Sequence, residues 1–424
     1  MSFHLRLALR SAWNRRGTLG LVLASIALAM ALLWTLEGLR RDLRISFSQA
    51  VSATDLVVGA RTGSVQLMLY AVFRVGGATN SVSMDSVRAL AAHRAVAWTV
   101  PIALGDSYRG FPVMGTTTGY FQHFAFGDRQ PLSLAAGRAF SGQLDGLYEA
   151  VLGAEVAQRL GHREGDRITL VHGMGGAPGM EHADKAFTVV GILQRTGTPV
   201  DRTVHVSLQA LEALHLDWVG GAPMPGLRIS AEDARKFDLE PKKVTAALVG
   251  LKSRAAVFAV QRFVAEYPGE PLMGVLPGVA LDELWDAVGL GERALQVVSA
   301  LAALVSLAGL VATVLAGLNE RRRELAVLRA MGAGPRDMLW LLVLEGAVVT
   351  AAGALLGVLA ATVGQTLAGP LLQARFGIQL QVGSPALTQW AALAAVLAAG
   401  MLASLLPAWR AYRLSLADGL TPRL

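Results

Sequence analysis

Four long apolar runs constrain the fold of this chain more than any other feature of the sequence. They cover residues 19–36, 294–318, 338–367 and about 387–406 of the 424 residues. Each run approaches or exceeds the roughly 20 residues that an α-helix needs to cross the hydrocarbon core of a bilayer. The chain is 53% hydrophobic, and its apolar residues are concentrated in these runs. We therefore expect a membrane α-helical protein with four transmembrane helices.

A segment of roughly 250 residues lies between the first and second runs and is long enough for one or two small domains. Short stretches rich in Val, Ile, Thr and aromatic residues alternate there with Gly and Pro, which is typical of an α+β domain. Strands are predicted over residues 98–104, 111–115, 167–172, 186–193, 203–206 and 227–230, and helices over residues 83–93, 154–160, 207–214 and 241–251. Residues 40–50 and 280–293 are predicted to form helical stalks that continue the first two membrane helices.

Arginine residues gather at the ends of the apolar runs. They are Arg6, Arg10, Arg15 and Arg16 before the first run, Arg321, Arg322, Arg323, Arg329 and Arg336 after the second, and Arg410, Arg413 and Arg423 in the tail. Cytoplasmic loops carry an excess of Lys and Arg, so both termini and the 319–336 loop are predicted to be cytoplasmic. The large domain and residues 368–386, which contain only Arg375, then lie outside. Arg40, Arg41 and Arg44 disagree with this topology but are outnumbered.

The first apolar run and the net charge each allow a second interpretation. Arg15 and Arg16 before an apolar run resemble the start of a signal peptide, but no small-x-small cleavage site follows it, so we expect an uncleaved anchor. The net charge of +7 could suggest nucleic-acid binding. Because much of this charge lies at the ends of the membrane segments, topology accounts for it, and no nucleic-acid partner is expected.

The charged loop after the second run is the strongest candidate for a docking surface. Leu325, Leu328 and Met331 recur at three-residue spacing, which predicts a short amphipathic helix that ends at Gly332 and Gly334. A helix of this kind on the inner membrane face is suited to binding a soluble partner. Its candidate docking residues are Glu320, Arg321, Arg322, Arg323, Glu324 and Arg329.

Three residues of the third run are candidates for a structural or coupling role. Gly353 and Gly357 form a G-x-x-x-G motif, which lets two helix backbones approach closely but does not say which neighbour is involved. Glu345 lies near the start of the same run, where an acidic side chain is costly unless it faces protein or headgroups. The first interpretation is that Glu345 reaches the inner headgroups, and the alternative is a role in coupling.

The sequence contains no recognisable catalytic motif. It has no G-x-x-x-x-G-K-[S/T] phosphate-binding loop, no G-x-S-x-G and no H-E-x-x-H. It also has no Cys, which rules out a thiolate nucleophile and a Cys-ligated metal. We therefore expect a non-catalytic chain with no cofactor of its own.

Residues 172–184 form the one stretch that suggests a metal. They include His172, Met174, Met180, Glu181, His182 and Asp184, whose side chains together could bind a transition metal. The alternative is a flexible Gly-rich hairpin loop, and the glycines favour this interpretation. Ordering such a loop costs about 1–2 kcal/mol of backbone entropy per residue, so no high-affinity metal site is expected. The histidines at positions 93, 123, 162, 205 and 215 are interpreted as scattered structural or surface residues.

Several stretches resemble the FtsX-like, MacB-type permease family of ABC transporters. They are residues 7–18 before the first run, residues 320–333 after the second, residues 407–420 at the end, and residues 150–157, 165–166 and 187–193 in the large domain. Residues 320–333 are the most specific of these. Together the stretches span nearly the whole chain.

The resemblance implies a subunit with four spans that forms a homodimer or pairs with a similar permease. A separate cytoplasmic ATP-binding subunit would dock through the helix after the second span, and its ATP-driven closure would move the outer domain. Members of this family act on periplasmic or outer-leaflet substrates, in lipoprotein release, macrolide or peptide efflux, haem export and control of cell-wall hydrolases. The sequence has no phosphate-binding loop, so the ATPase is expected to be another polypeptide.

The resulting hypothesis is a permease subunit in a bacterial inner membrane that transmits movement from the ATPase to a periplasmic domain. Its expected partners are the ATPase, a second permease copy, membrane lipid and a periplasmic partner. The alternatives are a membrane-anchored ligand-binding or sensor protein and, from residues 172–184, a metal-handling transporter. A neighbouring gene for an ATPase with a phosphate-binding loop would favour the first hypothesis, and its absence the sensor.

This hypothesis divides the chain into nine segments. They are a cytoplasmic amphipathic segment (1–17), the first transmembrane helix (18–37), a periplasmic α+β domain with helical stalks (38–293), the second transmembrane helix (294–318), a cytoplasmic coupling helix (319–337), the third transmembrane helix (338–367), a short periplasmic loop (368–386), the fourth transmembrane helix (387–407) and a cytoplasmic tail (408–424).

Overall fold

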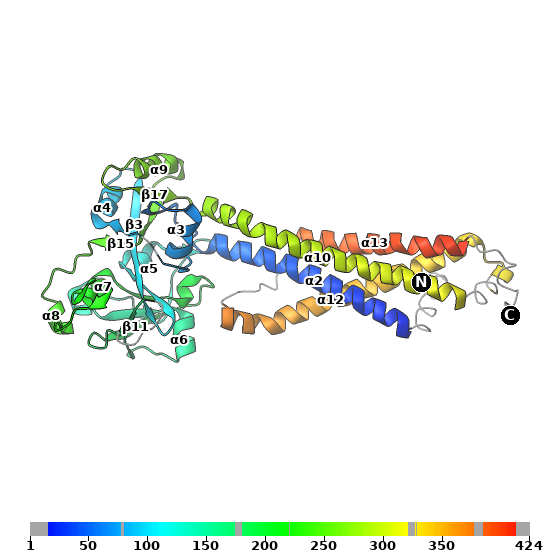
Figure 1. Cartoon of the computed structure of the whole chain (residues 1–424), viewed down its shortest axis with the longest axis horizontal. Helices are drawn as coiled ribbons and strands as arrows, with labels where there is room; N and C mark the ends of the chain where they lie inside the picture. Colours follow the sequence, from blue (N-terminus) through cyan, green and yellow to red (C-terminus); the bar gives the residue numbers. More distant parts are fainter. Residues whose placement is uncertain are drawn as a thin grey trace. The chain divides into compact units, whose positions relative to one another are not determined.

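The chain folds into two compact units. The computed structural model describes residues 16–77, 80–173, 180–219, 221–320, 327, 329–376 and 385–412. Arg44–Ala287 form an α/β unit, and Met1–Leu43 with Val288–Leu424 form a helical unit (Figure 1). The predicted fold class is confirmed, because the described chain has four membrane-length apolar helices and a large domain of mixed helix and strand between the first and the second.

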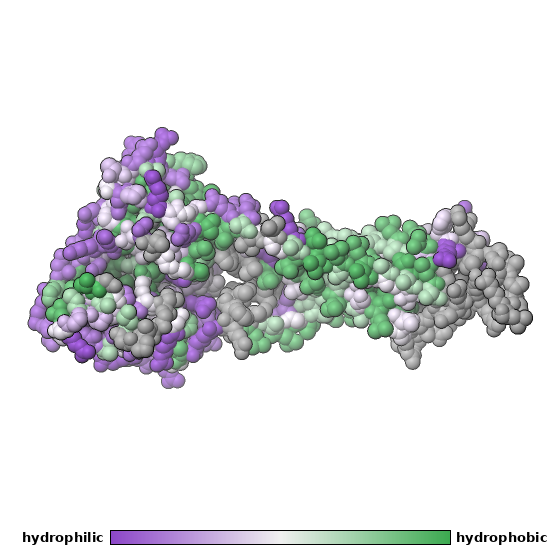
Figure 2. Space-filling view, in the orientation of Figure 1, coloured by the Kyte–Doolittle hydropathy of each residue, from purple (hydrophilic) through white to green (hydrophobic). Residues whose placement is uncertain are grey.

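Four long helices make up most of the described part of the helical unit, and two of them, the first and the second, extend into the α/β unit. They are α2 (Arg16–Gln49), α10 (Pro277–Glu320), α12 (Pro335–Phe376) and α13 (Leu387–Tyr412). Their apolar segments are Gly17–Arg41, Arg293–Ala316, Pro335–Leu371 and Leu387–Arg410, each long enough to cross a membrane. Hydrophobic residues cover much of their surface, whereas the surface of the α/β unit is largely hydrophilic (Figure 2). This contrast is expected for one unit in lipid and one in water.

Small residues bring α12 close to two other helices. A methyl group added at Gly357 would lie 2.4 Å from the carbonyl oxygen of Ala27 in α2, and one at Gly353 would lie 3.0 Å from the carbonyl oxygen of Leu23. The opposite partner is α13, since a methyl group at Gly346 would lie 1.8 Å from Ser404 Oγ. The G-x-x-x-G motif therefore faces α2, which the sequence did not reveal.

Hydrogen bonds made by polar side chains connect the helices inside this unit. Ser25 Oγ of α2 lies 2.8 Å from Ser306 Oγ of α10. Nearer the other end of the same pair, Gln296 Nε2 donates to Glu37 Oε1 at 2.9 Å. Gln389 of α13 donates to the carbonyl oxygen of Trp34 at 3.1 Å. Polar groups buried among apolar helices are costly unless paired, so these bonds fix which helices are neighbours.

An eleven-stranded mixed sheet forms the centre of the α/β unit. Its main path runs in the order β17-β1-β16-β3-β4-β12-β8-β11-β7, with β10 paired to β3 and β9 paired to β11. The neighbours are antiparallel except for β11 with β8 and β12 with β4. The strands are β1 (Leu56–Ala60), β3 (Val96–Tyr108), β4 (Phe111–Thr116), β7 (Leu134–Gly137), β8 (Glu149–Leu152), β9 (Arg167–Ile168), β10 (Val171–His172), β11 (Phe187–Leu193), β12 (Val204–Ser207), β16 (Ala246–Leu251) and β17 (Leu272–Val275).

Short hairpins and helices surround this sheet. The additional strand pairs are β2 (Val82–Ser83) with β15 (Lys243–Val244), β5 (Ala125–Phe126) with β6 (Gln130–Pro131), and β13 (Trp218–Val219) with β14 (Ala222–Pro223). The helices are α3 (Ser64–Ala71), α4 (Met84–Ala91), α5 (Gly119–His123), α6 (Ala154–Leu160), α7 (Leu208–His215), α8 (Ala231–Ala234) and α9 (Val257–Ala265), with 3₁₀ turns at Leu144–Gly146, Pro199–Arg202 and Arg254–Ala256. Ser83 and Ser207 cap α4 and α7 by accepting a hydrogen bond from the first helical turn.

Two sequence-based expectations for this unit are wrong. Residues 241–251 form no helix but contain the strands β15 and β16, and residues 227–230 form no regular strand. Strand β16 lies between β1 and β3, and Ala246 to Gly250 are buried. A strand covered on both faces is apolar at successive positions and lacks the alternation of a half-exposed strand. Periodicity alone could not separate such a strand from a buried helix.

Candidate functional site

The predicted docking segment lies mostly outside the described residues. Arg321, Arg322, Arg323 and Glu324 are not described, and neither is the side chain of Glu320, the last residue of α10. Arg329 is described in a helical turn, and Gly332 follows it with a φ of +99°, where the N–H of Gly332 donates to the Arg329 carbonyl. A left-handed glycine at this point is a common helix end. The docking role of the six residues stays a prediction.

Glu345 is buried inside the helical unit. Its side chain belongs to α12 and is 1% exposed. The interpretation that it reaches the headgroups at the membrane surface is therefore not supported by its position. A buried acid among membrane helices is costly and usually functional, so the coupling role of Glu345 remains a prediction.

The α/β unit brings together four side chains that are able to hold a metal ion. They are Asp106, His172, His182 and His215, whose ligand atoms all lie within 4.8 Å of one another. We call them the His/Asp cluster. They come from strand β3, strand β10, the chain just before β11 and the last residue of α7. The cluster thus depends on tertiary structure and not on one loop.

Strand pairing places the first two members side by side. Strand β10 runs antiparallel to β3, with His172 opposite Asp106. The pairing of β3 with β4 shifts register between Leu104 and Ser107, and irregularities of this kind redirect side chains. The third member is held by its backbone, because the N–H of His182 donates to the Leu170 carbonyl at 3.0 Å.

Three atoms of the cluster approach closely. His172 Nδ1 lies 3.0 Å from Asp106 Oδ1 and 2.9 Å from His215 Nε2. His215 Nε2 lies 3.4 Å from the same carboxylate oxygen. On the other side of its ring, His215 Nδ1 lies 2.8 Å from the carbonyl oxygen of Leu211. The imidazole of His215 is therefore oriented by its own helix.

Burial and charge set the protonation of the cluster. Burial alone would raise the pKa of Asp106, but hydrogen bonds from His172 and His215 outweigh it and lower this pKa to about 2. Burial lowers the pKa of His182 to about 4. Burial also acts to lower the pKa of His215, but the Asp106 carboxylate dominates and raises it. At neutral pH the Asp106 carboxylate is therefore ionised and His182 is neutral.

Trp218 and a buried ion pair surround the cluster. The Trp218 ring centroid lies 4.5 Å from that of His182 and 5.2 Å from that of His172. Lys185, three residues after His182, donates to Asp217 Oδ1 at 2.8 Å, and both side chains are buried. The charge of Lys185 is thus matched by a carboxylate of its own.

The sequence predicted only part of this arrangement. His172 and His182 belong to the stretch that suggested a metal, but Glu181 and Asp184 of that stretch are exposed and lie outside the cluster. Met174 is outside the described residues. The interpretation of His215 as a scattered residue is wrong, and Asp106 carried no local signal at all. Asp106 joins the cluster because β3 pairs with β10 in this register, and no spacing in the sequence reveals that pairing.

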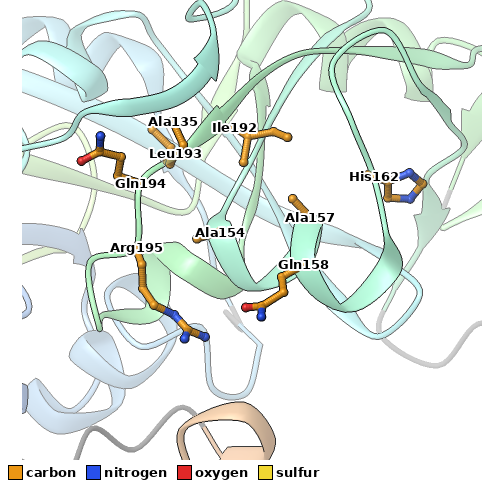
Figure 3. A pocket seen from close by; sticks show the side chains of 9 residues that line it. All are labelled: Ala135, Ala154, Ala157, Gln158, His162, Ile192, Leu193, Gln194 and Arg195. Carbon is orange, nitrogen blue, oxygen red and sulfur yellow. The ribbon is translucent and has the colours of Figure 1, made fainter. Parts of the chain in front are cut away.

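A shallow pocket lies elsewhere in the same unit. It has a volume of about 510 Å³ and is lined by Ala135, Ala154, Ala157, Gln158, His162, Ile192, Leu193, Gln194 and Arg195 (Figure 3). Figure 3 shows Gln158 and Arg195 on one side and His162 away from them. His162 is occupied by Asp166, at 3.0 Å, and by the Tyr108 hydroxyl, at 2.9 Å. These two contacts fix the orientation of the His162 ring.

Family comparisons define the class of this protein. The model of the MacB-like periplasmic core domain matches residues 18–267, and the model of the FtsX-like permease C-terminal region matches residues 296–416. The chain belongs to the FtsX-like, MacB-type permease family of ABC transporters, which confirms the resemblance seen in the sequence. It is an ABC transporter permease, and its four apolar helices and periplasmic-type domain fit a bacterial inner membrane protein.

Individual relatives are more distant. The chain is 24% identical over 237 residues to the lipoprotein-releasing system transmembrane protein LolC of Neisseria meningitidis serogroup B, a match that covers 55% of this chain and 50% of LolC. The chain thus spans about half the length of this curated relative. The periplasmic region of MacB from Actinobacillus actinomycetemcomitans has a TM-score of 0.34 at 10% identity, over 55% of this chain and 94% of that one. The extracellular domain of YknZ from Gram-positive bacteria has a TM-score of 0.31 at 14% identity, over 53% and 98%.

Proposed function

We propose that this chain couples ATP hydrolysis by a separate cytoplasmic ATPase to movement of its periplasmic domain. The substrate would be periplasmic or membrane-associated. Membership of an ABC permease family supports a partner ATPase, and the sequence has no phosphate-binding loop of its own. Its role would be to transmit movement, without catalysis. Family membership favours this function over a ligand-binding sensor.

The observation that carries the proposal is how α2 and α10 enter the α/β unit. Each helix contains a membrane-length apolar segment and continues without a break into residues of that unit. Within the unit, Ala50 and Val51 directly follow α2, and Ala280 and Leu281 lie in the first turns of α10. All four belong to one buried cluster that includes sheet residues such as Leu248. A shift of either helix would therefore press directly on the core of the sheet.

Hydrogen bonds would make the two helices move together. Within the helical unit, α2 and α10 are joined by Ser25 with Ser306 and by Glu37 with Gln296. In the α/β unit, Ser64 of α3 donates to Glu283 of α10. Displacing α2 without α10 would break the two part-buried bonds between them, which is unfavourable among apolar helices. The pair is therefore suited to act as one rod.

The predicted topology and dimer complete the proposal. Both termini and residues 319–337 would be cytoplasmic, and the α/β unit periplasmic, as the arginine distribution indicates. In the apolar segment of α10, Arg293–Ala316, only 28% of the most apolar part is buried within the chain. Its large exposed side chains are Leu295, Val297, Val298, Leu301, Leu304 and Val305. This surface is available to lipid and to a second copy of the permease in a homodimer.

Charge reversal in the docking segment tests the proposal. Changing Arg321, Arg322 and Arg323 together to Glu should abolish copurification of the ATPase and transport-dependent growth. Single surface pairs contribute only about 0–1 kcal/mol, so the triple change is needed. Three reversals place like charges across one interface, which can cost several kcal/mol. The matched control is the triple change to Lys, which keeps the charge and should retain the ATPase.

Insertion has to be established first, because these arginines are also topology signals. Labelling of single cysteines at positions 150 and 330 would show on which side each lies, and the chain has no native Cys to interfere. If the Glu variant inserts like the wild type and still binds and activates its ATPase at wild-type levels, the docking assignment is wrong.

A further inference from the structure

We propose that Asp106, His172, His182 and His215 form a zinc-binding site in the α/β unit. This site is separate from the shallow pocket of Figure 3 and from the predicted docking segment. The proposal does not depend on the transport function, since it rests only on side chains within one unit. It reverses the expectation drawn from the sequence, where residues 172–184 were interpreted as an unorganised Gly-rich loop.

The spacing of the ligand atoms fits a small tetrahedral ion. Zinc bonds of about 2.0–2.1 Å in tetrahedral geometry place neighbouring ligand atoms about 3.3 Å apart. Three atoms, His172 Nδ1, His215 Nε2 and Asp106 Oδ1, are separated by 2.9, 3.0 and 3.4 Å. The fourth ligand atom, from His182, is within 4.8 Å of the others. A zinc ion bound among these atoms would draw all four to this spacing.

Unpartnered polar atoms in the cluster point to a missing ligand. His182 is 1% exposed, and both of its ring nitrogens lack a hydrogen-bond partner among the described residues. Asp106 is 2% exposed, and its Oδ2 is likewise without a partner in the described part of the chain. Leaving a buried polar group unpaired costs roughly 1–3 kcal/mol. A bound cation would satisfy the imidazole of His182 and the second carboxylate oxygen in one step.

The orientation of His215 is the one that a metal ligand needs. A carbonyl oxygen only accepts hydrogen bonds, so the Leu211 carbonyl requires a proton on His215 Nδ1. A bound metal would displace the proton with which Nε2 bonds Asp106, and the freed Nε2 lone pair faces His172 and Asp106. Histidines that bind metals commonly donate their other nitrogen to a backbone carbonyl in this way. His172 would bind through Nδ1 with its proton on Nε2.

The donor set favours zinc over hard cations. Three imidazoles and one carboxylate suit a borderline ion such as zinc, whereas magnesium and calcium take oxygen ligands. The site also remains accessible, since the His172 and His215 side chains are 27% and 31% exposed. Lys185 does not oppose a cation with an unmatched charge, because Asp217 pairs with it. One side of the site is therefore open while the Asp106 and His182 side is buried.

Zinc binding by the full chain in detergent tests the proposal. The protein would be purified through a tag without histidines, stripped with a chelator and titrated with zinc against a chromogenic competitor. We expect one zinc per chain with a Kd below about 1 µM, as structural zinc sites readily reach. Magnesium should not compete. Removing a second-shell partner of a metal costs about 10–100-fold in affinity, so His182→Ala, which removes a direct ligand, should cost more than about 100-fold.

His182 is buried, so its variant could fail to fold. His215→Gln changes a partly exposed side chain and should show the same loss, with folding checked by circular dichroism and gel filtration. The matched control is His162→Gln, which removes a histidine that also lies beside an aspartate but outside the cluster, and it should bind zinc like the wild type. The proposal is wrong if the wild type shows no binding below about 1 µM, or if folded His215→Gln binds as tightly as the wild type.

Discussion

The two units of this protein differ in the kind of polar group that they bury. Among the described residues of the helical unit, the buried polar side chains are Ser299, Ser306, Glu345, Thr350, Gln389 and Ser404, and Glu345 alone is ionisable. The α/β unit buries Asp106, Glu155, His182, Lys185, Asp201, His205 and Asp217. Lipid makes ionisable groups expensive, and a water-exposed unit with a large core tolerates them where partners are available.

This difference separates packing from chemistry. In the helical unit, Thr350 and Ser404 each bond a carbonyl one turn back in their own helix, so their polarity is absorbed locally. Their small size serves close helix contacts. In the α/β unit, Lys185 pairs with Asp217 and Asp106 with His172, each across different elements, whereas both ring nitrogens of buried His182 lack a partner among the described residues. We infer that buried polar groups serve packing in the helical unit and are available for binding chemistry in the α/β unit.

Breaking a buried ion pair should have the largest effect. In Lys185→Met, Asp217 loses its charged partner while it is 5% exposed, and removing one partner of a buried ion pair costs about 3–5 kcal/mol. Thermal unfolding of the full chain in detergent would measure the loss. The control is Lys236→Met, whose pair with Asp233 is on the surface and should hardly change the unfolding temperature. Equal decreases in unfolding temperature for the two variants would contradict the prediction that the buried pair contributes more to stability than the surface pair.

Overpacking of the helical unit should have the next largest effect. In Gly357→Leu, the new side chain meets the Ala27 carbonyl of α2, which is backbone and cannot rotate away. Overpacking of this kind costs typically about 1–3 kcal/mol. Resistance to unfolding in detergent would report it. Gly364→Leu is the control, since a methyl group there meets nothing within 4 Å in the same helix. A stable Gly357→Leu variant would disprove the close approach of α12 to α2.

Acid should destabilise the α/β unit through His205. Burial, reinforced by the charge of Arg74, lowers the pKa of His205 to about 3. The unfolded chain takes up a proton near pH 6.5 and the folded chain does not, so stability is present above that pH and declines as the pH falls toward 3. At about 1.4 kcal/mol per pH unit, the loss reaches about 2 kcal/mol at pH 5.

Unfolding temperatures measured at pH 7 and pH 5 test this prediction. His205→Gln should lose less stability over this interval than the wild type, because the amide does not titrate. The same pH dependence in both proteins would assign the acid sensitivity to other groups.

The smallest effect should come from the bond between α2 and α10. Ser306→Ala removes the contact with Ser25, and hydrogen bonds between membrane helices average about 0.6 kcal/mol. Ser299→Ala is the control, because Ser299 bonds only the Leu295 carbonyl of its own helix among the contacts described for it. A double-mutant cycle of Ser25 and Ser306 in the same detergent should give a coupling of this size, and no coupling would remove this bond from the proposed rod.

The helical unit was the easier of the two to predict from the sequence. A run of apolar residues of membrane length has few alternatives to a spanning helix, so its signal is local. The G-x-x-x-G motif of Gly353 and Gly357 also follows from four-residue spacing. Which helix it meets does not, because that depends on the arrangement of all four helices. The docking role of residues 320–324 and 329 stays a prediction.

The α/β unit was harder because its structure is set by distant residues. The interior strand β16 lacks an alternating pattern, so its sequence predicts a helix where the structure has a strand. The His/Asp cluster joins Asp106 to His172, 66 positions later, through the pairing of β3 with β10, and adds His215 from the end of α7. Spacing along the chain carries no trace of such contacts. Residues 172–184 suggest a metal in the sequence, and the glycines between them favour a loop; zinc binding would decide between the two.

The most direct test of the account is whether α2 and α10 transmit movement. A single cysteine at exposed Glu232 would be spin-labelled in the Cys-free chain. In the reconstituted complex with its ATPase, the distance between the labels of the two permease copies in the proposed homodimer would be measured before and after trapping with an ATP analogue. The account predicts a distance change in the wild type. Ala287→Pro, which interrupts α10 where the two units divide, should abolish the change while ATP hydrolysis continues, and Ala287→Ser should not. A wild-type distance change in the proline variant would contradict the account.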